Sequence, residues 1–196
     1  MAEIKSALEI ALEKAEKIGK ASKEELKAQE WKEKGQRLAA RFLKQEEVDL
    51  VRELSEVPPE GKAPLVRGLV EIFLRNIVLP RDEYVLKDAR RALEGLNLVF
   101  SAFPEVKNLT REIEKLLSQY LQHREALYQQ LKQQFEAQLS GMEEALSQQM
   151  GVQVKVEAEM HPQFQEEWRK IRDQLDPQYQ KQLDYLKNIF RRVLGA

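Results

Sequence analysis

Apolar residues recur at the spacing of an α-helix along almost the whole chain, beginning at its first residues. Ile4, Leu8, Ala11, Ala15 and Ile18 follow one another at steps of four and three, which form one narrow stripe on a helix. A helix that lies on a membrane surface is rich in Lys and Arg on one face and in bulky aromatics on the other, and this segment has neither. The stripe therefore favours packing against a partner helix.

The next apolar positions predict a second helix. Gly19 is expected to end the first one, and Ser22 with Glu25 three residues later has the form of a capping box that starts the second. The apolar positions of this second helix are Leu26, Leu38 and Phe42, with an extension to Val48, Val51 and Leu54 left open. The stretch "EVPPEGKAP", residues 56–64, then breaks the helix because it combines prolines with a glycine. Residues 1–57 are thus predicted to form N-terminal helices.

Residues 58–104 are the most apolar part of the chain and predict a hairpin of two antiparallel helices at the core. Pro64 suits the first position of one helix, and Asp82 suits the cap of the other. Their apolar positions are Leu65, Leu69, Ile72, Phe73 and Ile77, followed by Leu86, Ala89, Leu93, Leu96 and Phe100. Gly68 and Gly95 weaken these helices by about 1 kcal/mol each relative to Ala. We therefore expect both glycines to mark close helix contacts.

Residues 105–150 contain no proline and a single glycine, and they predict one long, Gln-rich helix. A helix of this length extends for roughly 65–70 Å. Its apolar positions are Leu109, Ile113, Leu116, Tyr120, Leu127, Leu131, Phe135, Leu139, Met142, Leu146 and Met150. The first four step as heptads do, whereas the positions from Leu127 to Leu139 step by four, which indicates a straight or locally unwound seam. The far end of so long a helix needs a partner, either the terminal helices or another chain.

The stretch "VQVKVEAEM", residues 152–160, alternates apolar and polar residues with a period of two. It fits a strand that pairs with another edge, an extended connector, or a continuation of the long helix. We favour an extended connector over residues 151–161, because no second strand is evident. Residues 162–196 then predict a C-terminal helical hairpin, with Asp176 as N-cap and Pro177 as first residue of its second helix.

Together these elements predict an all-α fold: a helical bundle core with one long, coiled-coil-like helix and a C-terminal helical hairpin, in one structural domain. The composition agrees with this interpretation. About a third of the 196 residues are charged and only 8 are glycine and 7 proline, which is typical of long, solvated helices.

Charge and composition exclude several classes of protein. The net charge of −1 is spread evenly along the chain, so the sequence lacks the clustered basic residues of a nucleic-acid-binding protein, and we favour a partner other than nucleic acid. A basic patch that forms only in three dimensions is left open. The absence of cysteine excludes disulfides, thiolate metal sites and thiol nucleophiles. The most apolar stretch, "LVRGLVEIFLRNIVLP", is interrupted by charges, and the first residues lack the apolar run of a signal peptide. We expect a cytoplasmic protein without a membrane partner.

The two histidines do not form a recognisable site. His123 falls in the seam of the long helix, where a polar residue can fix register or make packing depend on pH; a partly solvated residue is the favoured alternative. His161 precedes Pro162 and suits an N-cap or the turn before it. Neither histidine has a Glu three residues before it, and HExxH, GxSxG and GxGxxG are absent. We therefore predict no enzyme, no catalytic or metal-binding residue, no cofactor and no small-molecule ligand.

What remains is the prospect of a protein partner or a homo-oligomer. The candidate interaction surface consists of apolar residues of the long helix together with a tryptophan in a mostly polar stretch. These residues are Leu127, Leu131, Phe135, Leu139, Met142, Leu146 and Trp31. For Trp31 the alternative that the ring folds onto the core is favoured, because tryptophan is highly buried on average.

The segments "IKSALEIALEKA", "HPQFQEEWRKI" and "LDPQYQKQLDYLK" resemble the two ends of a family of bacterial all-helical proteins without an assigned activity. The resemblance implies a bacterial cytoplasmic protein and gives no catalytic residues to carry over.

Three hypotheses for the function follow. The first is a non-enzymatic interaction or scaffold protein that self-associates through the long helix or its terminal hairpins. The second is a ribosome- or RNA-associated factor whose basic residues converge in the terminal hairpin; these are Arg169, Lys170, Arg172, Arg191 and Arg192. The third is a holdase-type chaperone that uses methionines as an adaptable surface. These are Met142, Met150 and Met160, for which ordinary core filling is the favoured alternative.

Overall fold

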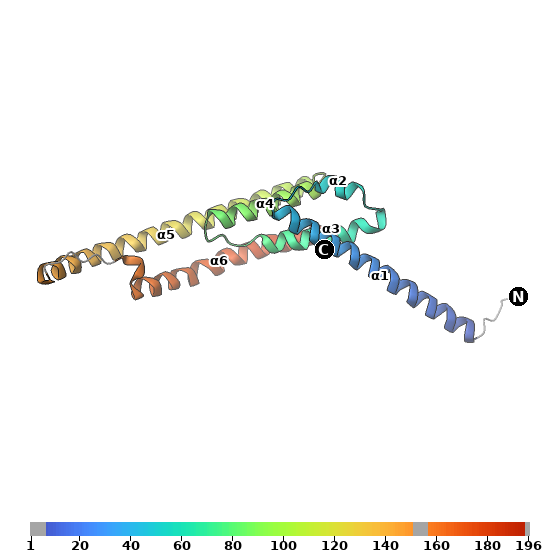
Figure 1. The fold of residues 1–196 in the computed structure, drawn as a ribbon, viewed down its shortest axis with the longest axis horizontal. Helices are drawn as coiled ribbons and strands as arrows, with labels where there is room; N and C mark the ends of the chain where they lie inside the picture. The colour runs from blue at the N-terminus through green and yellow to red at the C-terminus, as the bar shows by residue number, and fades with distance from the viewer. Residues whose placement is uncertain (1–6, 151–156, 195–196) are drawn as a thin grey trace. The chain divides into compact units, whose positions relative to one another are not determined.

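The computed structural model describes residues 7–150 and 157–194, with side chains for residues 23–140 and 157–192 (Figure 1). All regular structure among these residues is helical, which confirms the all-α prediction. The chain forms two compact units. Unit 1 comprises Met1–Ile77 and Arg91–Pro104, and unit 2 comprises Val78–Arg90 and Glu105–Ala196. A single structural domain stays a prediction.

Unit 1 begins with one long helix, α1 (Ala7–Leu43), where the pattern predicted two. Gly19 does not end this helix, so the predicted restart at Ser22 is wrong. A single glycine costs a helix only about 1 kcal/mol relative to alanine. The residues on either side are mostly Ala, Leu, Glu and Lys, which are strong helix formers. Their helix propensity keeps α1 continuous across Gly19.

The end of α1 is set by the backbone at Gln45, whose φ of 61° lies in the left-handed region. The amide of Glu46 donates to the carbonyl of Arg41 at 3.2 Å, and the amide of Gln45 donates to the carbonyl of Phe42 at 3.1 Å. This pair of hydrogen bonds is the Schellman motif that ends many helices. The Arg41 guanidinium Nε also pairs with Glu46 Oε2 at 2.8 Å, so the two residues meet through both backbone and side chain.

A separate short helix, α2 (Leu50–Ser55), follows this turn. Its N-cap is Asp49, whose Oδ1 accepts a hydrogen bond from the backbone N–H of Arg52 at 3.0 Å. The extension of the preceding helix to Leu54 is therefore wrong. The apolar spacing does continue past Leu43. The left-handed backbone at Gln45, however, ends α1 before the later apolar positions are reached.

The next helix, α3 (Pro59–Asn76), begins about one turn before the predicted start at Pro64. Pro64 lies near the beginning of the helix, where its missing N–H removes a single backbone hydrogen bond. Tertiary packing offsets this loss. A Cβ on Gly61 would lie 2.6 Å from Cε2 of Trp31, so the first turn of α3 sits directly against a tryptophan of α1.

The helices α1 and α3 cross at two glycines, one on each helix. A Cβ on Gly35 would overlap the carbonyl oxygen of Leu65, and a Cβ on Gly68 would overlap the carbonyl oxygen of Lys32. The two backbones therefore approach more closely than helices that carry side chains at the crossing. The prediction that Gly68 marks a close helix contact is confirmed.

The helix α4 (Glu83–Val99) contributes to both units, with residues up to Arg90 in unit 2 and the remainder in unit 1. Asp82 caps it as predicted, accepting a hydrogen bond from the amide of Val85 at 2.9 Å. Within unit 1, Gly95 lies against α3, where a Cβ would come within 2.5 Å of the Phe73 ring. The predicted close contact at Gly95 is therefore confirmed as well.

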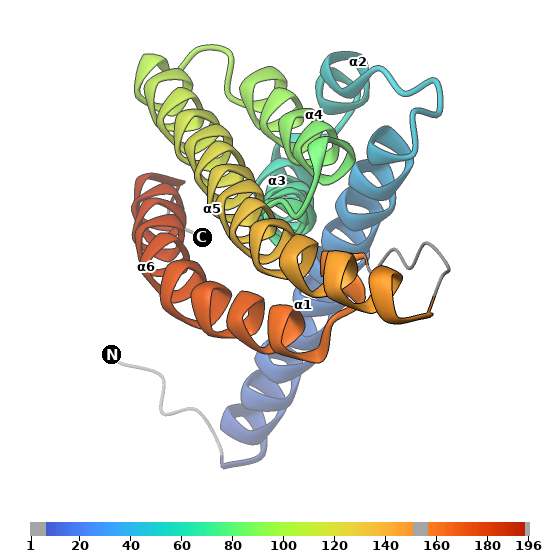
Figure 2. The same ribbon diagram turned by 90° about the vertical axis from the view of Figure 1, so that its left-hand side faces the viewer.

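Unit 2 is built on α5 (Pro104–Met150), a single helix of 47 residues, as predicted for residues 105–150. It lies beside α6 (Pro162–Leu194) in both views (Figures 1 and 2). Residues 151–156, which hold most of the alternating stretch, lie outside the described residues. The described end of the connector contains the short 3-10 helix η1 (Ala158–Met160) between two extended residues.

The C-terminal segment is one helix, so the predicted hairpin over residues 162–196 is wrong. Pro177, the predicted start of a new helix, lies inside α6. Packing against α5 holds the helix together on both sides of the proline, since Leu175 and Leu183 are both buried. Asp176, the predicted N-cap, instead accepts a hydrogen bond from the hydroxyl of Tyr120 at 2.8 Å.

The start of α6 agrees with the sequence. His161 precedes its first residue, and its Nδ1 lies 3.3 Å from the backbone N–H of Gln163, the geometry of an N-cap. Its ring also lies 6.0 Å from that of Phe135 on α5. His161 therefore acts as the helix cap that its position before Pro162 predicted.

Candidate functional site

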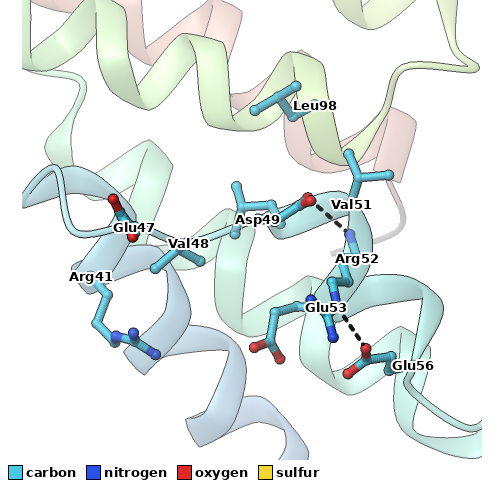
Figure 3. Close-up of a pocket in the computed structure, with 10 residues that line it drawn as sticks. Arg41, Glu47, Val48, Asp49, Val51, Arg52, Glu53, Glu56 and Leu98 are labelled. Carbon is cyan, nitrogen blue, oxygen red and sulfur yellow. Dashed lines mark hydrogen bonds and ion pairs between the residues drawn. The ribbon is translucent and has the colours of Figure 1, made fainter.

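Unit 1 carries an open hollow of about 670 Å³ between the end of α1, the segment that follows it, α2 and the end of α4 (Figure 3). A volume of this size is ample for a few side chains of a bound partner. The lining residues are Arg41, Glu47, Val48, Asp49, Leu50, Val51, Arg52, Glu53, Glu56 and Leu98.

Capping contacts fix the walls of this hollow. One wall is the turn at Gln45, held by the Schellman hydrogen bonds. Another is α2, whose start is held by the Asp49 cap and whose end is held by an ion pair between Arg52 Nε and Glu56 Oε1 at 3.0 Å (Figure 3). The pKa of Arg52 is raised, chiefly by its hydrogen bond to Glu56. These contacts hold the walls of the hollow in place.

The charged residues of the hollow are mostly paired. Arg41 is held by Glu46, and Glu53 by Lys34 of α1, with the Lys34 Nζ 3.4 Å from the Glu53 Oε2. Glu47 has no hydrogen-bond or ion-pair partner among the residues that the structure describes. The carboxylate of Glu47 is thus free to meet a charge from outside the chain.

Two apolar side chains on the hollow are exposed to solvent. Val51 of α2 is 55% exposed and Leu98 of α4 is 37% exposed, and Figure 3 shows Val51 pointing toward Leu98. Leu50 beside them is buried and Val48 is half-buried. The hollow therefore combines an apolar patch with a charged rim, an arrangement that often marks a binding surface.

The predicted interaction surface on the long helix is found elsewhere, in unit 2, and is largely used within the chain. Leu131 is buried together with Phe164 and Trp168 of α6, and Leu127 and Phe135 pack against this cluster. The Phe135 and Phe164 rings meet edge to face at 5.5 Å. Leu131 is therefore covered within the chain, whereas Leu127 and Phe135 are half-buried, and the candidate interaction surface stays a prediction.

The other predicted surface residues divide into three cases. Leu139 is buried. The side chains of Met142 and Leu146 lie outside the described residues. Trp31 is half-buried against Gly61, which agrees with the favoured interpretation that it folds onto the core. Trp31 belongs to unit 1 and is not part of the α5–α6 cluster.

A polar belt interrupts the apolar contact between α5 and α6. Tyr120 donates to Asp176, and both burial and this carboxylate raise the pKa of Tyr120. One turn along, His123 Nδ1 lies 3.4 Å from the Tyr179 hydroxyl, and the histidine is exposed. This agrees with the favoured interpretation of a partly solvated histidine in the seam. The polar groups of Tyr120 and Asp176 are thus paired with each other across the two helices.

A second polar contact holds η1 against α5. The Lys132 ammonium lies 2.6 Å from Glu159 Oε1, and the Tyr128 hydroxyl donates to the same oxygen at 3.3 Å. The hydrogen bond from Lys132 is the main reason that the pKa of Glu159 is lowered. The Gln165 side chain donates to the Glu159 carbonyl at 2.6 Å. These contacts anchor the entry to α6 and explain Glu159 as a structural residue.

The basic residues that were expected to converge in a hairpin are separated along α6. Arg169, Lys170 and Arg172 lie near its start, whereas Arg191 and Arg192 lie near its end, roughly 30 Å away at 1.5 Å per residue. Lys170 is also paired with Glu166 and Glu167. The predicted convergence is wrong, because α6 does not fold back on itself.

The described residues contain no group of three or more His, Asp or Glu placed to hold a metal ion. Within the described parts of the chain, no helix is long and apolar enough to cross a membrane. Among the methionines of the chaperone hypothesis, Met160 is 79% exposed, and the other two side chains lie outside the described residues.

These features define an all-helical protein of two compact units with an open hollow in unit 1. The chain belongs to a family of unknown function, DUF6657, whose match covers residues 51–192. Comparison with the curated proteins and with the solved structures finds no match. The match includes α3, α4 and α5 entirely and begins within α2, so Val51 and Leu98 of the hollow lie inside it and α1 lies outside it.

The hollow was not predicted from the sequence. Val48 and Val51 were considered only as an extension of a helical stripe, and nothing in the periodicity shows that Val51 and Leu98 stay exposed. The available signal was Asp49 before "LVRELS", which has the form of an N-cap and would have separated α2 from α1. The left-handed backbone at Gln45 has no such signal, because glycine or asparagine is the usual residue at that position.

Proposed function

We propose that this chain is a non-enzymatic helical protein that acts by binding another protein, as an adaptor or scaffold in the bacterial cytoplasm. The observation that carries the proposal is the hollow of unit 1, where Val51 and Leu98 are exposed beside a charged rim. Apolar surface bordered by polar residues favours a protein partner over solvent. The sequence, which has no catalytic motif, supports the same class of function.

The structure removes the basis of one of the two alternatives, the RNA-associated role. An RNA-associated role depends on basic residues that meet in a hairpin, and they lie far apart on α6. A holdase role depends on three methionines, of which the described residues show one exposed side chain, Met160. The side chains of Met142 and Met150 lie outside the described residues, so Met160 is the one observation that bears on this role.

Self-association is a second part of the proposal. Every side chain from Lys23 to Glu30 of α1 is exposed, including Leu26, so these residues have no cover from the rest of the described chain. A second copy of the chain is one way to cover them. The measurement is light scattering across a range of protein concentrations. A mass that rises with concentration supports self-association, and a constant monomer mass removes it.

The partner is tested by photo-crosslinking in the native cells. A photoreactive amino acid replaces Leu98 on the hollow, and in a matched control it replaces Tyr185, an exposed aromatic residue of α6 in unit 2. We expect a discrete crosslinked product from position 98 that is absent from position 185. The interaction proposal fails at this surface if the two positions give the same products or none.

A further inference from the structure

The hollow has a chemical character that restricts what can occupy it. Its exposed apolar patch is small, since Val51 and Leu98 are the two lining side chains that are both apolar and exposed. A partner therefore needs one or two apolar anchors rather than a broad apolar face. Such anchors at a spacing of three or four residues are what an amphipathic helix presents to a groove.

The charges around this patch favour a positive partner. The lining residues include two arginines and four carboxylates, a formal balance of −2. Both arginines are held by carboxylates, Arg41 by Glu46 and Arg52 by Glu56, so neither is free to receive an acidic partner. Glu47 has no ion pair or hydrogen bond with another described residue. An acidic segment would bring like charges together, whereas a basic one would be complementary.

The hollow also needs no rearrangement before a partner binds. The Schellman turn at Gln45 and the Asp49 cap hold its walls, and the glycine crossing fixes α1 against α3 in the same unit. A preformed site spends less free energy on ordering when it binds. A partner that binds here therefore loses less affinity to the ordering of the site.

We infer that the hollow of unit 1 binds a basic amphipathic helix of a partner protein, with Val51 and Leu98 receiving its apolar anchors and Glu47 pairing with one of its Lys or Arg residues. The inference rests on the proposed interaction function and adds the chemistry of the partner. It also assigns a role to each side of the hollow, with the apolar patch providing affinity and the acidic rim providing selection by charge.

The test uses the full chain and a fluorescently labelled peptide of Leu and Lys in an amphipathic helical pattern, roughly 18 residues or five turns long. A matched peptide carries Glu in place of every Lys. Binding is measured by fluorescence anisotropy at low and at moderate salt. We expect the Lys peptide to bind with a micromolar Kd that weakens with salt, and the Glu peptide not to bind.

Three variants of the protein locate the binding. Leu98→Asp is expected to weaken the Lys peptide about tenfold or more, as loss of a central anchor does. Glu47→Lys is expected to weaken it several-fold and to reduce the dependence on salt. Tyr185→Asp, on an exposed residue of unit 2, is expected to bind as the unchanged protein does. All three positions are exposed, and circular dichroism shows whether each variant keeps its helical content.

Several outcomes would overturn the inference. It fails if the Lys peptide does not bind, if the Glu peptide binds equally well, or if Leu98→Asp and Glu47→Lys leave the affinity unchanged. A crosslink from position 98 to a second copy of this chain would identify that copy as the occupant and would also overturn it. If position 98 crosslinks to a different protein but the Lys peptide does not bind, the proposed interaction function stands. The inference that the partner segment is a basic helix is then rejected. If position 98 gives no crosslink in cells, the interaction function at this surface falls.

Discussion

The α1–α3 contact of unit 1 and the α5–α6 contact of unit 2 join helices in opposite ways. In unit 1, glycines on both helices let the backbones approach until a Cβ would overlap a carbonyl oxygen. In unit 2, large side chains fill the space between the helices, with Tyr128 lying edge to face on both Phe164 and Trp168. The first contact therefore leaves no room for added side-chain atoms, and the second depends on the side-chain volume that already fills it.

The difference shows which kind of substitution destabilises each pair of helices. A backbone cannot move aside for a new methyl group without shifting the whole helix, so the glycine crossing should resist even the smallest substitution. A layer of aromatic rings loses both buried area and packing when one ring is taken away. Surface charges matter less in both cases, because exposed ion pairs contribute little to stability.

The chain carries a reporter for each contact. It has two tryptophans, Trp31 against Gly61 in unit 1 and Trp168 in the aromatic layer of unit 2. Replacing one of them with Phe leaves the fluorescence of the other to report unfolding by denaturant. Each comparison below uses the variant that keeps the tryptophan of the unit under test.

The largest effect is expected from Phe164→Ala in unit 2. Phe164 is completely buried and contacts the rings of Tyr128 and Phe135, so its loss leaves a cavity in the layer. We expect the free energy of unfolding to fall by about 4 kcal/mol. The measurement is denaturant unfolding followed through Trp168. A loss below about 1 kcal/mol would mean that the layer closes over the gap and does not hold the two helices together.

The next effect is a matched pair of substitutions in unit 1, Gly68→Ala and Gly95→Ala. Both gain the same helix propensity, but the new Cβ meets the backbone of Lys32 in the first case and the side chain of Phe73 in the second. Because the far end of a side chain can shift by a few tenths of an ångström, whereas a backbone moves only with its helix, we expect Gly68→Ala to cost about 2–3 kcal/mol and Gly95→Ala about 1 kcal/mol. Unfolding followed through Trp31 measures both. Equal losses would contradict the backbone-limited description of the crossing.

The smallest effect is a gain in stability from Gln45→Gly at the end of α1. Gln45 adopts a left-handed φ of 61°, which glycine reaches without strain, and its side chain is exposed. We expect the free energy of unfolding to rise by about 1 kcal/mol, measured by denaturant unfolding followed through Trp31. Gln36→Gly, within the helix, serves as the control and should be destabilising. A loss of stability in Gln45→Gly would show that the Gln45 side chain contributes to the turn.

Several parts of the fold could be predicted because local chemistry decides them. The all-α class and the continuous α5 follow from helix-forming composition without prolines inside that helix. Asp82 caps α4 through its own side chain, and Gly68 and Gly95 stand out as glycines inside helical patterns. In each case the signal lies within a few residues of the structure that it specifies.

The errors arose where distant contacts decided the outcome. Pro177 is a strong local signal for a new helix, but burial of Leu175 and Leu183 on either side keeps α6 continuous. Trp31 against Gly61 extends α3 ahead of Pro64 in the same way. The candidate surface on the long helix stays a prediction, and the pattern shows an apolar stripe at Leu131 but not that Phe164 covers it. The hollow depends on which apolar residues remain uncovered, and a single sequence does not contain that information.

The division of α4 between the two units has a consequence for the order in which the protein can fold during synthesis. Unit 1 needs Arg91–Pro104 as well as Met1–Ile77, so a nascent chain that has just passed residue 77 cannot complete it. By the time unit 1 is complete, Val78–Arg90 has also been made, and this segment must wait for Glu105 and the residues after it before unit 2 can form. The two units are therefore interleaved in time, and truncation anywhere within α4 should leave both of them unfinished.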